Sequence, residues 1–194
     1  MDKELTTVIF VRHALPEFNE DDRNRPLTEE GRRDSRIVLE TLRDRYVLGF
    51  VSSPYRRSIE TILEASYFFD MGIHTDERLR ERKVGERFPD RLRERWADFS
   101  FAEPGGECLQ SVQDRNVAAL QDILREYAGK IVVVGTHGTA LSTILHYYDP
   151  SFGADDFLRI VSWMPYIVEL TFDGEQLVGK KELGYVDKSE SKII

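Results

Sequence analysis

Cysteine is almost absent from this sequence of 194 residues, in which Cys108 is the only one. A single cysteine forms no intramolecular disulfide and builds no multi-cysteine zinc site. Because disulfide-free chains are typical of reducing compartments, we expect a cytoplasmic protein. A chain of this length buries a sizeable core without such crosslinks, and it is expected to form a single domain.

The sequence also lacks a long apolar run and an excess of positive charge. No stretch approaches the length of a membrane span, and the N-terminal residues lack the apolar core of a signal peptide. The formal net charge is −8, which disfavours nucleic acid and anionic membranes as partners. If the substrate is an anion, its site needs a local cluster of cations.

What the sequence does contain is an apolar run that ends in a cation and an imidazole. Residues 8–11 read Val-Ile-Phe-Val, and Arg12 and His13 follow. Such a run is typical of a strand buried on both faces of a parallel sheet. Ligands of these sheets bind beyond the carboxyl ends of the strands, so Arg12 and His13 are candidate site residues. The same pair is equally typical of the start of a solvated loop.

The pattern occurs a second time. Residues 131–136 form another apolar run, which leads into His137, Gly138 and a helix expected over 139–148. If the two strands are parallel, both histidines reach one edge of the sheet. The Gly138 amide at a helix N-terminus, Arg12 and an arginine from 56–57 would then form a phosphate or oxyanion pocket.

Three other interpretations compete with this pocket. A lone histidine at a strand end is more often structural than catalytic. Two histidines with Asp21, Asp22 or Glu81 would suit zinc or iron, although neighbouring arginines would repel the metal. A Ser-His-Asp hydrolase is disfavoured because the sequence contains no G-x-S-x-G elbow.

The rest of the chain alternates between strand and helix patterns. The expected elements are helices over 28–46, 54–69 and 107–128, strands over 49–53 and 73–75, and a hairpin of 166–172 with 176–183. Residues 70–107 form a lid-like insertion with a Trp96, Phe99 and Phe101 cluster. The alternation predicts an α/β three-layer sandwich with a mostly parallel central sheet flanked by helices.

Two helix starts and one tail carry specific expectations. Thr28 is expected to cap the first helix, whose buried face would include Val38, Leu39, Leu42 and Tyr46. Gly31 in its first turn indicates close packing or a turn. Ser53 is expected to cap the next helix, with Pro54 at its first position. The domain is expected to span 1–187, and the tail after Asp187 to be mobile.

A series of short motifs then runs through the chain in order. They are Val11-Arg12-His13-Ala14 with Asn19, Pro26-Leu27-Thr28-Glu29-Glu30-Gly31, Ser52-Ser53-Pro54-Tyr55-Arg56-Arg57-Ser58-Ile59-Glu60-Thr61, Leu79-Arg80-Glu81, Gly105-Gly106-Glu107, and Gly135-Thr136-His137-Gly138. Together they resemble the histidine phosphatase superfamily, the phosphoglycerate mutase-like family of branch I. The resemblance covers nearly the whole chain and implies a phosphoglycerate mutase-like fold.

The resemblance implies roles for individual residues. His13 matches the nucleophile that becomes phosphorylated, and Arg12 and Arg57, rather than Arg56, match the phosphate-binding arginines. His137 matches the second histidine of the pocket, Asn19 a residue near the phosphate, and Glu81 the acid that protonates the leaving oxygen. A neutral imidazole attacks phosphorus, and fixed donors stabilise the transferring group, so no metal or cofactor is implied.

The sequence departs from the family pattern at three places. Ala14 replaces the commoner glycine, and Pro16 stands where many members have Ser or Thr. After Glu81 the usual Phe-Gly-x-Trp-Glu-Gly is absent. Two alternatives to Glu81 as the proton donor therefore stay open: Glu86 is a less favoured substitute, or Glu81 is one charge in a solvated run over 76–83. The arginines from Arg78 to Arg95 are mostly expected to be solvated, with recognition of a second anionic group as the alternative.

The short chain favours a phosphatase that hydrolyses small phosphomonoesters, because the mutases implied by the resemblance are longer. Phosphoglycerate mutase-type transfer and a catalytically inactive phosphate-binding module are the alternatives. The expected partner is a small phosphorylated substrate, with no nucleic acid and no membrane, and a homodimer is left open.

Overall fold

Two parallel strands at the centre of the sheet carry the two histidine motifs to the same edge. The computed structural model describes residues 4–18 and 20–190. In it, β1 (Thr6–Arg12) pairs with β4 (Ile131–Thr136), and Arg12 lies opposite Thr136. The residue after each strand is therefore a histidine at the carboxyl edge, His13 beside His137.

The sheet is mostly parallel, as predicted. Its strand order is β3-β2-β4-β1-β5-β6. The strands β2 (Val47–Ser52) and β3 (Ile73–Thr75) run parallel to β4, whereas β5 (Trp163–Asp173) and β6 (Gln176–Asp187) form an antiparallel hairpin beside β1. The predicted hairpin is confirmed, and its strands are longer than expected.

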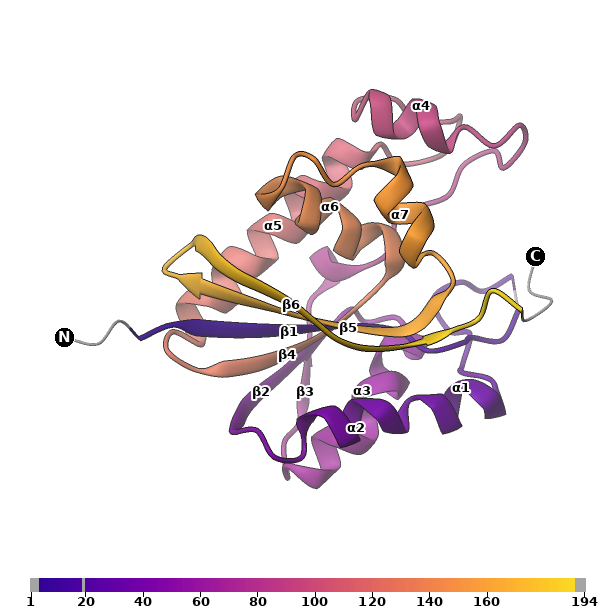
Figure 1. Cartoon of the computed structure of the whole chain (residues 1–194). Coiled ribbons are helices and arrows are strands. Elements are labelled where there is room, and N and C mark those ends of the chain that lie inside the picture. Colours follow the sequence, from indigo (N-terminus) through magenta and orange to yellow (C-terminus); the bar gives the residue numbers. More distant parts are fainter. Residues whose placement is uncertain (1–3, 19, 191–194) are drawn as a thin grey trace.

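Helices cover both faces of the sheet and make three layers, which confirms the predicted fold class (Figure 1). On one side lie α1 (Glu29–Asp34), α2 (Arg36–Leu42) and α3 (Arg56–Phe68). On the other lie α5 (Leu109–Glu126), α6 (Gly138–Tyr148) and α7 (Ala154–Ile160), with α4 (Leu92–Ala97) at the outer end.

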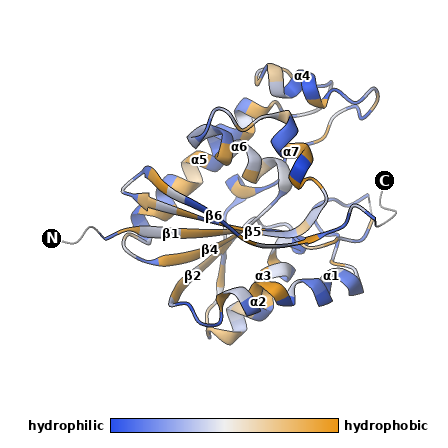
Figure 2. Ribbon diagram, viewed as in Figure 1, coloured by the Kyte–Doolittle hydropathy of each residue, from blue (hydrophilic) through white to orange (hydrophobic). Residues whose placement is uncertain are grey.

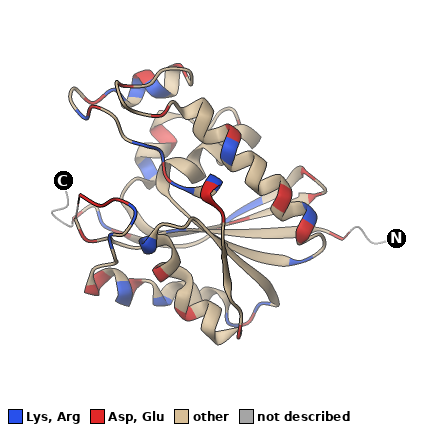
Figure 3. Cartoon of the chain, turned by 180° about the vertical axis from the view of Figure 1, so that it is seen from behind, with Lys and Arg blue, Asp and Glu red and all other residues tan. Residues whose placement is uncertain are grey.

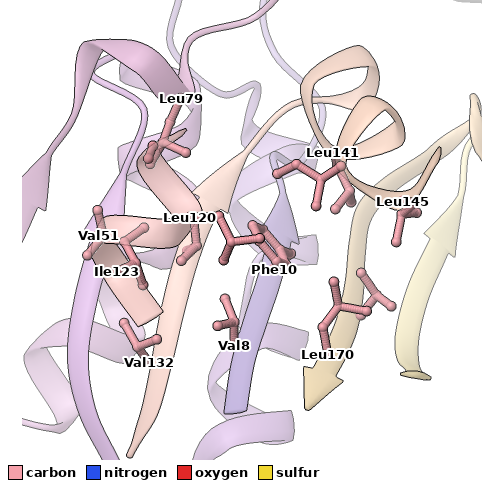
Figure 4. Packing of buried hydrophobic residues seen from close by; sticks show 14 of the residues in the cluster. Val8, Phe10, Val51, Leu79, Leu120, Ile123, Val132, Leu141, Leu145 and Leu170 are labelled. Atoms are coloured by element: carbon pink, nitrogen blue, oxygen red, sulfur yellow. The ribbon is translucent and has the colours of Figure 1, made fainter. Parts of the chain in front are cut away.

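Alternate residues of β1 explain why its whole run is apolar. Val8 and Phe10 pack into the core under α5 and α6, whereas Ile9 and Val11 pack into the core over α2 and α3. All four side chains are fully buried (Figure 4 shows Val8 and Phe10). Each contributes about 1.5–3 kcal/mol by burial. Figure 2 shows the same arrangement as orange central strands between helices with blue outer faces.

The helix expected over 28–46 is two helices instead. Thr28 caps α1 as predicted, since its hydroxyl accepts a hydrogen bond from the Gly31 amide at 2.9 Å. The chain turns at Ser35, whose hydroxyl donates to the Arg32 carbonyl at 2.8 Å, and α2 ends at Leu42. Tyr46 lies beyond the helix and is 79% exposed, so its assignment to the core was wrong.

Two further helix predictions are corrected by the structure. Ser53 does not cap α3, which begins two residues after Pro54 with Tyr55 at its N-cap. Helix α7 was not predicted at all. Lys188, the first residue of the tail that the sequence predicts to be mobile, is buried and paired with Glu30 and Asp34. The rest of the tail from residue 191 lies outside the described residues.

The segment 70–107 contains β3, a short 3-10 helix (Glu77–Leu79) and α4. The aromatic cluster predicted there includes Trp96 and Phe99, whose ring centroids are 5.6 Å apart. Trp96 also contacts Phe152 and Phe157, so the segment packs against the α6–α7 region.

Charged residues of both signs are interspersed over the outer elements, and the central strands carry few (Figure 3). Within the described ranges, no helix has the length and apolar character that crossing a membrane requires.

Candidate active site

The two histidines predicted to share a site lie next to each other. The ring centroids of His13 and His137 are 5.3 Å apart, and the planes meet at 62°. His13 is 6% exposed and His137 is fully buried. Burial first, and then the charges of Arg57 and Arg12, lower the pKa of both imidazoles well below 6.5. Both rings are therefore neutral at neutral pH.

The hydrogen bonds of His13 define its tautomer. Its Nδ1 lies 2.8 Å from the Ala14 carbonyl oxygen, which only accepts, so Nδ1 carries the proton. The lone pair is left on Nε2, which suits a nucleophile. The backbone here is held by two more bonds, from the His13 amide to the Thr136 carbonyl and from the Ala14 amide to the Thr61 hydroxyl.

Ser53 and Tyr55 hold His137. The Nε2 atom of His137 lies 2.8 Å from Oγ of Ser53, and the Tyr55 ring lies edge-on to the imidazole at 5.2 Å. Nδ1 of His137 is buried and has no hydrogen-bond partner among the described residues. One nitrogen of the second histidine is thus anchored, and the other is a buried polar atom without a partner in the described part of the chain.

Arg12 is held by the end of α7. One terminal nitrogen donates to the carbonyls of Ile160, Val161 and Trp163 at 2.8, 2.9 and 3.2 Å. A cation at a helix C-terminus is favourable because the last carbonyls lack partners within the helix. Nε of Arg12 is buried without a partner in the described part of the chain. Burial first, and then Arg57 against the opposing effect of Glu81, lower the pKa of Arg12 to about 10, so it stays charged.

Gly138 allows Arg12 to approach the start of α6. A Cβ on Gly138 would lie 3.2 Å from Cζ and Nε of Arg12, closer than most real contacts. The glycine of this motif therefore makes room for the guanidinium.

Arg57, rather than Arg56, lies in the site. The Arg57 side chain is 1% exposed and donates to the Asp22 carbonyl at 2.5 Å, with an ion pair to Asp22 Oδ1 at 3.2 Å. Its guanidinium lies 5.0 Å from the Tyr55 ring centroid. Nε of Arg57, too, is buried and unpartnered within residues 4–18 and 20–190. Arg56 instead points to solvent and pairs with Glu60.

Glu81 sits at the N-terminus of α6. Its carboxylate accepts hydrogen bonds from the backbone amides of Thr139 at 3.0 Å, Ala140 at 3.1 Å and Arg82 at 2.7 Å. The Thr139 and Ala140 amides are orphan donors of a helix start, which attract anions. Glu81 thus occupies amides next to Gly138 that would otherwise face the pocket.

Several of these groups border a cavity of about 520 Å³ at the carboxyl edge of the sheet, although His137 and Gly138 are not among its lining residues. Its lining includes Arg12, His13, Arg57 and Glu81. Glu86, the alternative donor, is not among the lining residues. Asn19 lies outside the described residues. No group of three or more His, Cys, Asp or Glu placed to hold a metal occurs in the described part of the chain.

Comparison with known protein families identifies the family of this chain. The sequence profile of the histidine phosphatase superfamily (branch 1) matches residues 8–180. The chain belongs to this superfamily.

Two curated relatives illustrate the range of this superfamily. Phosphoserine phosphatase 1 of Hydrogenobacter thermophilus is 26% identical over 69% of this chain and 71% of its own length. Phosphoglycerate mutase-like protein 4 of Arabidopsis thaliana is 28% identical over 90% of this chain and 84% of its own. Among solved structures, a mycobacterial glucosyl-3-phosphoglycerate phosphatase superposes with a TM-score of 0.74 at 19% identity, covering 92% of this chain and 97% of that one.

The departures from the superfamily pattern change the walls of the pocket. Ala14 is fully buried, and its amide is bonded to Thr61, so the extra methyl is accommodated. Pro16 forms a bridge with Leu27 and lines the cavity, so this wall is apolar where many histidine phosphatases have a hydroxyl.

Sequence reasoning missed the groups that hold the histidine phosphatase motifs in place. The sequence predicts Ser53 as a helix cap and Tyr55 as part of that helix, and it offers Asp22 only as one possible ligand in the disfavoured metal site. The carbonyls of 160–163 carry no sequence signal, because any residue supplies a carbonyl. The only sequence signal for Ser53 and Tyr55 is that they lie in the same motif as Arg57, Ser53-Pro54-Tyr55-Arg56-Arg57.

Proposed function

We propose that this protein is a metal-independent phosphatase that hydrolyses small phosphomonoesters through a phosphohistidine at His13. One observation carries the proposal. Two buried guanidiniums, Arg12 and Arg57, each keep an Nε without a partner among the described residues, beside two neutral imidazoles. A buried donor without an acceptor is costly, so these two Nε–H groups make the arrangement complementary to a bound dianion.

The reaction has two steps. Nε2 of His13 attacks phosphorus, a P–N bond forms, and the P–O bond to the leaving group breaks. Water then attacks phosphorus and breaks the P–N bond, which releases inorganic phosphate and returns His13 to its starting form. Arg12, Arg57 and an Nδ1–H of His137 stabilise the charge on the equatorial oxygens.

Glu81 is the proposed proton donor to the leaving oxygen, and it then accepts a proton from the attacking water. The support is its place in the lining beside His13. Asn19 is proposed to contact the phosphate on the strength of the motif alone.

The curated relatives support hydrolysis over mutase-type transfer. Besides the phosphoserine phosphatase, an uncharacterized phosphatase of Bacillus subtilis is 26% identical over 73% of this chain and 76% of its own. An inactive binding module is disfavoured because His13, Arg12, Arg57 and His137 are all present. We further propose one domain over 1–187 with a lid-like insertion at 70–107, and a cytoplasmic location.

The test is release of phosphate from para-nitrophenyl phosphate with and without EDTA. We expect activity that resists the chelator, and an acid-labile phosphoprotein that accumulates on rapid quenching. His13→Ala should lower kcat by roughly 10³-fold or more. Arg57→Ala should lower kcat/KM by roughly 10²-fold, whereas Arg56→Ala, its exposed neighbour, should retain the wild-type rate. Activity that survives His13→Ala or needs a metal would refute the proposal.

A further inference from the structure

The lining of the catalytic cavity carries more positive charge than the binding of one phosphate group requires. Its lining contains six cations and two carboxylates, in a chain whose formal net charge is −8. The cations are Arg12, Arg57, Arg25, Arg82, Lys83 and Arg87, and the carboxylates are Asp22 and Glu81. Arg12 and Arg57 are buried, and Arg25 shares the Asp22 carboxylate with Arg57. Arg82 is also buried, whereas Lys83 and Arg87 are exposed at the mouth of the cavity.

Existing ion pairs neutralise only part of this charge. Asp22 pairs with Arg25 at 2.6 Å as well as with Arg57, and the buried Arg82 pairs with Glu103 at 3.3 Å. Lys83 and Arg87 have no ion-pair partner anywhere in residues 4–18 or 20–190. Two cations at the mouth are therefore available to a ligand.

The segment that carries these two cations is built into the fold. The Glu107 amide donates to the Lys83 carbonyl at 2.9 Å, and the Glu86 amide donates to the Pro104 carbonyl at 3.1 Å. Gly85 lies so close to residues 104–106 that a Cβ on it would be 2.5 Å from the Pro104 carbonyl oxygen. The Gly105-Gly106-Glu107 motif thus supports the mouth.

A buried carboxylate anchors the same region from behind. Glu103 is 5% exposed and pairs with both Arg82 and Arg95 of α4. The backbone bonds and this ion triad therefore fix the chain that carries Lys83 and Arg87 before a ligand arrives, so that only the two side chains have to be ordered on binding.

Apolar side chains also line the cavity. Leu15, Pro16, Phe18, Val84 and Met164 contribute to the lining. A phosphate group fills only a small part of about 520 Å³. The cavity thus combines the buried arginines, apolar surface and the two exposed cations Lys83 and Arg87 in one lining.

We propose that Lys83 and Arg87 form a subsite for a second anionic group, so that the substrates are phosphomonoesters whose leaving group carries a carboxylate or another phosphate. This inference rests on the proposed function, since it concerns the substrate of the same cavity. It assigns recognition of the leaving group to residues 83–87, where the sequence departs from the superfamily pattern.

Binding to the His13→Ala protein tests the subsite separately from catalysis. The probes are para-carboxyphenyl phosphate and its neutral isostere para-carbamoylphenyl phosphate, compared by calorimetry at low salt. We expect the carboxylate to bind about tenfold more tightly, equivalent to about 1.4 kcal/mol. The preference should shrink as salt is added, because the mouth is open to solvent. Equal affinities would overturn the proposal.

A third probe, para-phenylene bisphosphate, distinguishes the two sources of the anion. A preference for it beyond the statistical factor of two, and beyond that for the carboxylate, assigns the subsite to a second phosphate. A larger preference for the carboxylate assigns it to a carboxylate.

Paired variants locate the effect. In the His13→Ala background, Lys83→Gln with Arg87→Gln should reduce the preference for the charged probes to about onefold to twofold. Arg93→Gln removes an exposed charge from the same insertion but outside the cavity, and it should keep the preference. A preference that survives the double variant would overturn the assignment. Turnover of the same esters by the wild-type protein tests the proposed function independently, because the binding result does not depend on it.

Discussion

Ser53 is the residue on which the orientation of His137 depends. Its Oγ accepts a hydrogen bond from the Tyr55 amide at 3.2 Å and faces Nε2 of His137 at 2.8 Å. If the hydroxyl donates to Nε2, the ring proton is on Nδ1, the nitrogen without a partner in the described chain. That tautomer turns His137 into a donor for a phosphoryl oxygen, whereas the other tautomer would present a lone pair to an anion.

Ser53→Ala should therefore lower kcat/KM about tenfold, since it removes the group that selects the tautomer. The imidazole nitrogen chemical shifts of His137 should move toward a mixture of tautomers, a change that mere loss of packing would not produce. Ser52→Ala is the matched control, because Ser52 is also fully buried but bonds to Ser58. Unchanged nitrogen shifts in Ser53→Ala would show that the hydroxyl does not choose the tautomer.

Glu81 has a second task at the start of α6 that bears on its proposed role as a proton donor. Its carboxylate accepts three backbone hydrogen bonds. A donor matters most when the leaving group is a poor one, because an alkoxide needs a proton and a nitrophenolate does not. The two kinds of ester thus separate proton donation from the structural contribution of Glu81.

Glu81→Gln should lower kcat roughly 10²-fold or more on an alkyl phosphate such as phosphoserine, and only a few-fold on para-nitrophenyl phosphate. Glu86→Gln, a change of the same kind outside the cavity lining, should affect neither ester. Equal losses on both esters would assign Glu81 to helix capping alone.

At the scale of elements, strands were easier to predict than helix ends. β1 and β4 are buried on both faces, so their whole length is apolar and visible in the sequence. The division between α1 and α2 depends on a local bond of Ser35 that competes with the helix. Helix α7 is short, and its end is held by Arg12 from 148 residues away, so no local pattern announces it.

Gly31 shows how a tertiary contact overrides helix propensity. A Cβ there would lie 2.2 Å from the Leu15 carbonyl oxygen, and this carbonyl also accepts from the Thr28 amide. The close packing indicated by the sequence is thus a contact of α1 with the segment that follows His13.

Gly31→Ala should destabilise the protein by about 2 kcal/mol, because backbone must move and the gain of about 1 kcal/mol in helix propensity does not compensate. The midpoint of thermal unfolding should fall by roughly 4–8 °C. In the control Gly72→Ala, nothing lies within 4 Å of the new Cβ, so stability should change by less than about 0.5 kcal/mol. A Gly31→Ala protein as stable as the wild type would show that the segment after His13 yields easily.

At the scale of the whole molecule, the site is assembled from segments that are distant in the sequence. Arg12, His13 and His137 were predictable because they terminate recognisable strands. Their partners were not, because Ser53 lies 84 residues from His137 and Asp22 lies 35 residues from Arg57. Such contacts depend on tertiary structure, and no local sequence pattern predicts them.

The two buried histidines should also couple the stability of the whole protein to pH. Both pKa values are lowered in the folded state, by burial first and then by Arg57, with Arg12 adding to the effect. Below the ordinary value of 6.5 the unfolded chain takes up protons that the folded protein refuses, so the free energy of unfolding falls as pH falls. Above that value neither state binds these protons, and their contribution is constant.

With two such groups, the free energy of unfolding should fall by up to about 2.7 kcal/mol for each pH unit below pH 6.5. Burial raises the pKa of Glu107, but hydrogen bonds from Arg115 and Arg80 outweigh it and lower this pKa to about 2. Glu107 therefore reduces the free energy of unfolding only below about pH 4.5. Urea unfolding between pH 5 and 7.5 therefore isolates the histidines. The slope should flatten in His13→Asn with His137→Asn, and it should persist in His74→Asn, which removes an exposed imidazole. A wild-type stability that stays constant from pH 7.5 to 5 would mean that the folded site accepts these protons, contrary to the neutral imidazoles that the proposed nucleophile requires.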